Sequence, residues 1–95
     1  MPSVRYSNKA LDDLRKIGNF TLDRWGLVQA EKYVNTLREG CILIAELPHV
    51  GRHYNPSNPS RYRFELHSHV VLYSIREGGI TVQRFLQKNR LLPRG

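Results

Sequence analysis

The sequence lacks the features that would mark an exported or membrane protein. No apolar run approaches the roughly 18–20 residues that a transmembrane helix needs. Residues 1–13 contain no apolar segment of the kind that forms the centre of a signal peptide. The single cysteine, Cys41, excludes an intramolecular disulfide framework. These absences predict a cytoplasmic protein in a reducing compartment, with no membrane partner.

Acidic side chains are scarce in the second half of the chain. The 95 residues include 15 Lys and Arg against 8 Asp and Glu, and the formal net charge is +7. Residues 1–48 hold seven basic and six acidic side chains, whereas residues 49–95 hold eight basic side chains and only Glu65 and Glu77. An excess this one-sided favours an anionic partner, either nucleic acid or an acidic protein surface, with solubility alone as the simpler alternative.

The length allows one domain, residues 1–95, and its first half has the apolar periodicity of two helices. After a short strand, Ser7 or Asn8 is expected to cap a first helix that ends at Gly26, and Pro48 stops the second helix. Because almost nothing separates the helices, they must form an antiparallel hairpin. The expected buried stripes are Leu11, Leu14, Ile17, Thr21 and Trp25 in the first helix, and Ala30, Tyr33, Val34, Leu37, Cys41, Ile44 and Leu47 in the second. Trp25 is expected to pack inside the hairpin turn.

Three strands are predicted after the helices. Residues 49–60 have the composition of a surface loop, and residues 61–66 alternate between apolar and charged side chains, as in a half-buried strand. Residues 69–75 are apolar throughout, which is typical of a central strand. Residues 80–86 form the last strand, where a shift of the apolar phase near Arg84 indicates a bulge. The order β-α-α-β-β-β predicts an α+β fold, with an N-terminal helical hairpin packed on a small, mainly antiparallel sheet.

Groups for metal or nucleophilic chemistry are few. His49 and His53 flank a turn, and His67 and His69 bracket another, without a further ligand at a suitable spacing. Cys41 falls on the apolar stripe of the second helix, which favours a core position over a reactive one. The sequence therefore predicts no metal site, no cofactor and no covalent catalysis.

Metal-free RNA cleavage is the enzymatic alternative that the composition permits. It requires a general base, a general acid and cations that stabilise the phosphate. The residues that would serve are four cations and two histidines: Arg61, Arg63, Arg84, Lys88, His67 and His69. Arginines on the outer face of a strand are more often simply solvated.

Several stretches of the sequence resemble the ParE toxins of the RelE/ParE superfamily. They include RWG between the helices, QAEKY at the start of the second helix and AELPHVGR after it. HSHVVLYSI followed by ITVQRFLQKNR is similar to the central and final strands of that family. The likeness covers about residues 4–90 and keeps the predicted order of elements.

This resemblance implies the toxin component of a type II toxin–antitoxin system, which inhibits DNA gyrase and blocks replication without catalytic residues of its own. It also implies a cognate, ParD-like antitoxin with an acidic disordered segment. Toxins of the RelE branch cleave mRNA on the ribosome, often with a late tyrosine or histidine. Here no tyrosine follows Tyr73 and no histidine follows His69, which favours the ParE branch.

Two alternatives stay open, because FLQKNR stands where ParE chains commonly have Leu-His-Gln. One is a RelE-like, ribosome-dependent mRNA endonuclease. The other is a degenerate toxin or plain nucleic-acid-binding module.

The C-terminal segment, residues 84–95, is the expected target-binding element. It combines basic and amide side chains with two adjacent leucines, which would anchor it on gyrase or fold back on the helices. The expected contacts with gyrase and gyrase-bound DNA are Arg84, Gln87, Lys88, Asn89, Arg90, Leu91, Leu92 and Arg94. Arg61 and Arg63 are expected to form a basic face on the sheet.

Overall fold

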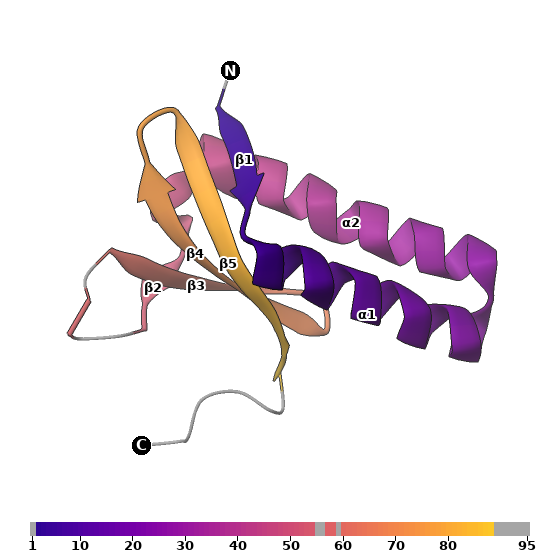
Figure 1. Ribbon diagram of the computed structural model, residues 1–95. Coiled ribbons are helices and arrows are strands. Elements are labelled where there is room, and N and C mark those ends of the chain that lie inside the picture. The colour runs from indigo at the N-terminus through magenta and orange to yellow at the C-terminus, as the bar shows by residue number, and fades with distance from the viewer. Residues whose placement is uncertain (1, 55–56, 59, 89–95) are drawn as a thin grey trace.

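The computed structural model describes residues 2–54, 57–58 and 60–88, and consists of two helices packed on a five-stranded sheet (Figure 1). The elements are β1 (Ser3–Tyr6), α1 (Asn8–Trp25), α2 (Leu27–Glu46), a 3-10 turn η1 (Pro48–Val50), β2 (Arg52–His53), β3 (Arg61–Leu66), β4 (His69–Arg76) and β5 (Gly79–Gln87). The strand order is β1-β5-β4-β3-β2; β1 runs parallel to β5 and the other pairs are antiparallel. The predicted α+β fold with a helical hairpin is confirmed.

One helix cap and one glycine determine where the helical hairpin begins and where it turns. The Ser7 hydroxyl accepts a hydrogen bond from the Ala10 N–H at 3.0 Å and donates to the Gln83 carbonyl at 2.8 Å, so the cap also ties α1 to β5. Gly26 is the only residue between the helices, and its φ of 91° lies where an L side chain would be strained. With so short a connection, α2 must turn back along α1, as Figure 1 shows.

The sheet contains the bulge that the sequence predicts and two pairings that it does not. Tyr73 pairs with Val82 and Leu72 pairs with Arg84, which leaves Gln83 as the extra residue of β5. The loop predicted over residues 49–60 contains η1 and the short edge strand β2, which pairs with β3. The N-terminal strand β1 lies next to the last strand and closes the other edge.

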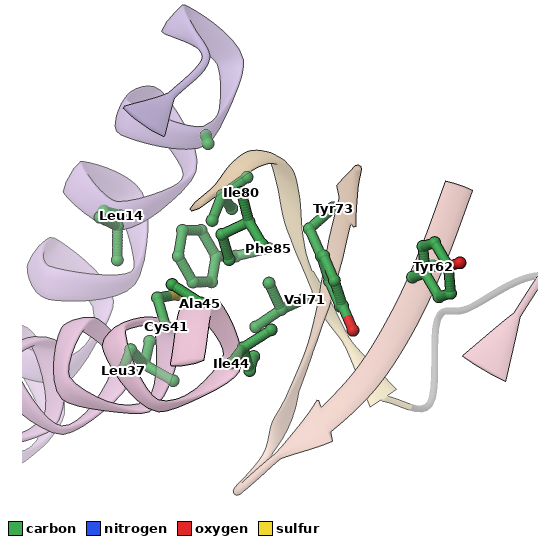
Figure 2. Close-up of a cluster of buried hydrophobic side chains, with 12 residues drawn as sticks. Leu14, Leu37, Cys41, Ile44, Ala45, Tyr62, Val71, Tyr73, Ile80 and Phe85 are labelled. Atoms are coloured by element: carbon green, nitrogen blue, oxygen red, sulfur yellow. The ribbon is translucent and has the colours of Figure 1, made fainter. Parts of the chain in front are cut away.

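The core lies between the helices and one face of the sheet (Figure 2). In this view Leu37, Cys41 and Ile44 of α2 project toward Val71 and Phe85 of the strands. All five of these side chains are buried, and the two β residues come from neighbouring strands. Residues of alternate strand positions therefore face the helices, and those between them face away.

Two buried contacts hold α2 and the chain after it on the sheet. A Cβ on Gly40 would collide with the side chain of Leu66, so the helical glycine allows α2 to approach β3 closely. The buried Tyr73 hydroxyl donates to the Pro48 carbonyl at 2.7 Å and accepts from the Gly51 N–H at 3.0 Å. This hydroxyl fixes the segment between α2 and β2.

The far end of the hairpin corrects the predicted packing of Trp25. Its side chain is 70% exposed, because α1 ends there and the turn projects beyond the strands, as Figure 1 shows. Leu11 and Leu47, predicted within the buried stripes, are 47% and 67% exposed. Leu11 lies beside the buried stripe of α1, and Leu47 follows the last residue of α2, where the chain leaves the helix. Neither described helix is long and apolar enough to span a membrane.

A basic face of the sheet as candidate functional site

The sheet face that points away from the helices carries most of the basic strand residues. We call it the basic face and define it by Arg5, Arg52, Arg61, Arg63, Arg76, Arg84 and Lys88, with Glu65 as its acidic member. Successive side chains of a strand point to opposite faces of the sheet, so these residues lie on the face opposite the buried positions that contact the helices. Arg61 and Arg63 thus lie where the sequence predicts a basic face, and their neighbours on other strands enlarge it.

The strand register arranges five of these arginines in two rows across the sheet. The first row consists of Arg52, Arg63, Leu72 and Arg84 on β2, β3, β4 and β5. The second row consists of Arg61, Ser74, Thr81 and Arg5 on β3, β4, β5 and β1. Leu72 also lies on this outer face, where it is only 6% exposed and lines a hollow together with Tyr54, Arg61 and Arg84.

Arg84, a predicted target-binding residue, is held by α1. Its Nε lies 2.8 Å from Oδ2 of Asp13 and its Nη2 lies 3.1 Å from Oδ1, which is a forked pair. Oδ2 also accepts the Phe85 N–H at 3.0 Å, and the Asp13 side chain is only 12% exposed. Hydrogen bonding to Asp13 raises the pKa of Arg84 above its usual value. Asp13 thereby joins α1 to β5 just after the bulge.

Lys88 and Arg63 share the one acid of the basic face. Glu65 lies 3.6 Å from Arg63 and 3.5 Å from Lys88, and its side chain is 58% exposed, so both pairs are weak. The buried Nε of Arg63 has no hydrogen-bond partner among the described residues. Gln87 is exposed at the end of β5. The other predicted contacts, Asn89, Arg90, Leu91, Leu92 and Arg94, lie outside the described residues and stay predictions.

A shallow hollow of about 380 Å³ lies on the basic face beside the start of α1. Its lining residues are Ser7, Asn8, Lys9, Tyr54, Arg61, Leu72, Gln83 and Arg84. Three cations around one hollow favour an anionic group, and the Tyr54 phenol adds a hydroxyl and an aromatic ring. Sequence reasoning missed Tyr54, because nothing in a turn-rich loop indicates that one of its residues lines a hollow with residues of distant strands.

The histidines proposed for RNA cleavage do not join these cations. The His69 ring is 8% exposed on the helix-facing side, where its Nδ1 lies 2.8 Å from the Tyr33 hydroxyl. Burial lowers the pKa of His69. His67 occupies the β3–β4 turn with a φ of 59°, edge-on to the same tyrosine. Cleavage would require a histidine on the same face as the cations, and strand alternation places His69 and Arg61 on opposite faces, so His69 does not meet this requirement.

The remaining candidate groups belong to the fold. Cys41 is fully buried, as predicted, and burial raises the pKa of its thiol to about 12, so the unreactive thiol form dominates. His49 and His53 both contact the Tyr62 ring. In the part of the chain that the structure describes, no three His, Cys, Asp or Glu side chains gather as metal ligands.

Besides Leu11 and Phe20 of α1, large apolar side chains are exposed in two groups on the helices and the chain leaving α2. The hairpin tip consists of Leu22, Trp25, Leu27 and Val28, and the α2 exit patch consists of Ile42, Leu43, Leu47 and Val50. Each of these side chains is more than 40% exposed. Groups of large exposed apolar residues usually mark protein–protein contacts.

The arrangement of a helical hairpin over this sheet defines the class of protein, which is the RelE/ParE-like fold. A chain of the chromosomal ParDE toxin–antitoxin system from P. aeruginosa superimposes with a TM-score of 0.76 at 19% identity, covering 92% of this chain and 96% of that one. A chain of the E. coli DinJ–YafQ complex superimposes with a TM-score of 0.55 at 14% identity, covering 98% of this chain and 100% of that one.

The sequence comparisons identify the family within that class. Residues 4–92 match the family described as the ParE toxin of the type II toxin–antitoxin system parDE. Toxin ParE1 of Mycobacterium tuberculosis (strain CDC 1551 / Oshkosh) is 35% identical over 89 residues, or 90% of this chain and 91% of the relative. Toxin ParE1 of Caulobacter vibrioides is 33% identical over 75 residues, or 79% and 78% of the two chains. The chain belongs to the ParE toxin family of type II toxin–antitoxin systems.

Proposed function

We propose that this ParE-family toxin acts in the cytoplasm by inhibiting DNA gyrase and blocking replication, with no catalytic residue or cofactor of its own. The observation that carries the proposal is the family match over residues 4–92, supported by a basic face suited to an anionic target. Relatives at 35% and 33% identity carry the name Toxin ParE1.

The chemistry of the basic face supports binding over catalysis. Acid–base cleavage needs two groups that exchange protons within reach of the phosphate. His69 points into the protein, and Glu65 is shared between Arg63 and Lys88. Tyr54 is then the remaining titratable group beside the cations of the hollow.

The test is a gyrase supercoiling reaction with ATP, into which the purified toxin is titrated. We expect linear, protein-linked DNA to accumulate, and less of it with a Lys88→Ala, Arg90→Ala, Leu91→Ala variant. Lys32→Ala is the matched control, because Lys32 is exposed on α2 away from the basic face. If a large molar excess of toxin that still arrests growth yields no cleaved complexes, gyrase is not the target.

A RelE-like endonuclease is the second candidate, and the hollow is the observation that favours it. There the Tyr54 phenol faces the same space as Lys9 and Arg61, so a general acid and two cations would meet one phosphate. If the toxin is such an endonuclease, Tyr54→Phe abolishes cleavage of translated mRNA, and neither form of the toxin inhibits gyrase. Mapping mRNA ends on ribosomes from cells that express either form decides between the candidates.

We further propose that a ParD-like antitoxin with an acidic disordered segment neutralises the toxin. An acidic segment complements the basic half of the chain, while apolar side chains of the same partner would cover the hairpin tip and the α2 exit patch. Because such a partner binds only folded toxin, saturating antitoxin raises the melting temperature. Equal melting temperatures with and without antitoxin would contradict this part of the proposal.

A further inference from the structure

We infer that the basic face binds the phosphate backbone of duplex DNA directly, through its two rows of arginines. This inference rests on the proposed function, since the relevant duplex is the one that gyrase holds. It adds a second contact to that function: the toxin touches the DNA itself as well as the enzyme.

The basic face holds like charges close together in the absence of a partner. Arg52 lies directly opposite Arg63 on the neighbouring strand, and like charges in that position destabilise a sheet. Arg61 lies on the same face two residues along β3, about 6.6–6.8 Å from Arg63. Glu65 pairs with Arg63 at 3.6 Å, but Arg52 and Arg61 have no acidic partner among the described residues. A bound polyanion would relieve this repulsion.

Several of these guanidinium groups have free hydrogen-bond donors. Among the described residues, Arg5, Arg52 and Arg61 form no ion pair or side-chain hydrogen bond. Arg84 contrasts with them, since Asp13 engages its fork. Ser74 and Thr81 lie between Arg61 and Arg5 in the second row and add hydroxyl groups of the kind that contact phosphate oxygens.

The composition of the basic face favours DNA over an acidic protein segment as its partner. Every large apolar side chain that is exposed in the described residues lies on α1, α2 or the chain leaving α2, and none lies on the basic face. Protein interfaces usually have an aromatic or apolar centre, whereas DNA interfaces are polar and strongly positive. The basic face is polar and strongly positive, as DNA interfaces are. Neighbouring strands are about 4.8 Å apart, so each row of four strands extends about 14 Å, enough for several phosphates of one backbone.

The experiment compares two variants that lose the same charge. The face variant is Arg5→Gln, Arg52→Gln, Arg61→Gln, and the control variant is Arg15→Gln, Lys16→Gln, Lys32→Gln on the helices. Binding to a labelled 20-base-pair duplex is followed by fluorescence anisotropy over a series of salt concentrations. Matching thermal unfolding curves establish that both variants are folded.

We expect wild-type and control proteins to bind the duplex with a steep salt dependence. Each lost phosphate contact lowers the slope of log K against log salt by about 0.9, so the face variant should lose roughly 2 to 3 units of slope and at least about tenfold in affinity at low salt. Equal slopes for the two variants would overturn the inference. So would a wild-type protein that binds a glutamate-rich peptide but not the duplex under the same conditions.

The gyrase reaction separates this inference from the proposed function. Duplex binding through the basic face without cleaved gyrase complexes would leave the inference standing and remove the proposed target. Conversely, cleaved gyrase complexes formed by a toxin that does not bind the duplex would support the proposed target and overturn the inference.

Discussion

The basic sheet face and the helical hairpin present two different surfaces on opposite sides of one core. The face exposes arginines in rows and no large apolar side chain, while the helices and the chain leaving α2 expose ten large apolar side chains within the described residues. Electrostatic attraction acts at long range and depends on salt, whereas apolar contact needs close packing. The difference indicates two kinds of binding chemistry on different parts of the toxin.

Asp13 joins the helical hairpin to the basic face through Arg84, so we expect its removal to have the largest effect on stability. Asp13→Ala removes the forked pair with Arg84 and leaves the Phe85 N–H without its acceptor. We expect a loss of about 2 kcal/mol in the free energy of unfolding, measured by urea denaturation. The adjacent Asp12, which pairs only with the exposed Arg15 and Lys16, is the control, and Asp12→Ala should leave the urea midpoint unchanged.

Tyr73 tests the link between the end of the hairpin and the sheet. Tyr73→Phe leaves the Pro48 carbonyl and the Gly51 N–H without the hydroxyl that joins them, and should cost about 1–2 kcal/mol. The control is Tyr62→Phe, because the Tyr62 hydroxyl has only a 3.5 Å contact with His49. Equal stabilities of the two variants would show that the tether contributes nothing.

Trp25 tests whether the hairpin tip serves binding and not folding. Since its ring is 70% exposed, Trp25→Ser should change the free energy of unfolding by no more than about 0.5 kcal/mol. Affinity for the antitoxin, measured by calorimetry, should fall at least about tenfold if the tip is covered in the complex. A large loss of stability would instead support the packing that the sequence predicts.

His69 gives the smallest effect, which appears as a pH dependence of stability. Burial depresses its pKa in the folded state below the usual value of about 6.5, so the unfolded chain binds the proton more readily. The stability that neutral His69 contributes is present above pH 6.5 and is lost as the pH falls toward the depressed pKa. Urea midpoints at pH 7.5 and 5.5 should therefore differ more for the wild-type protein than for His69→Gln.

Much of the fold could be predicted because its signals are local. The Ser7 cap, the Gly26 turn, the β3 alternation and the bulge near Arg84 each depend on a few neighbouring residues. The prediction failed where the apolar periodicity of a helix continues beyond the part of that helix that packs against the sheet. Trp25 keeps the spacing of the α1 stripe, yet the sheet does not extend beneath it.

Less of the candidate site could be predicted. Arg61 and Arg63 lie on one strand, so simple alternation places them on a common face. An acidic residue near the start of a helix is usually explained by the helix dipole, so nothing in the sequence marks Asp13 as the partner of a distant arginine. The helix begins at Asn8, so Asp13 lies further along and is free to hold Arg84 across the interface. Tyr54 had no signal in the sequence at all.

The sequence alone established the order of the two helices and of four of the five strands, the phase of those strands and the accumulation of positive charge after residue 48. These properties follow from hydrogen bonding and periodicity over a few residues. Only the tertiary structure decided that Arg5 from the first strand shares a row with Arg61, and that Asp13 engages Arg84. The physical reason is that strand register and helix placement minimise the free energy of the whole core, so no local stretch of sequence encodes which distant side chains meet.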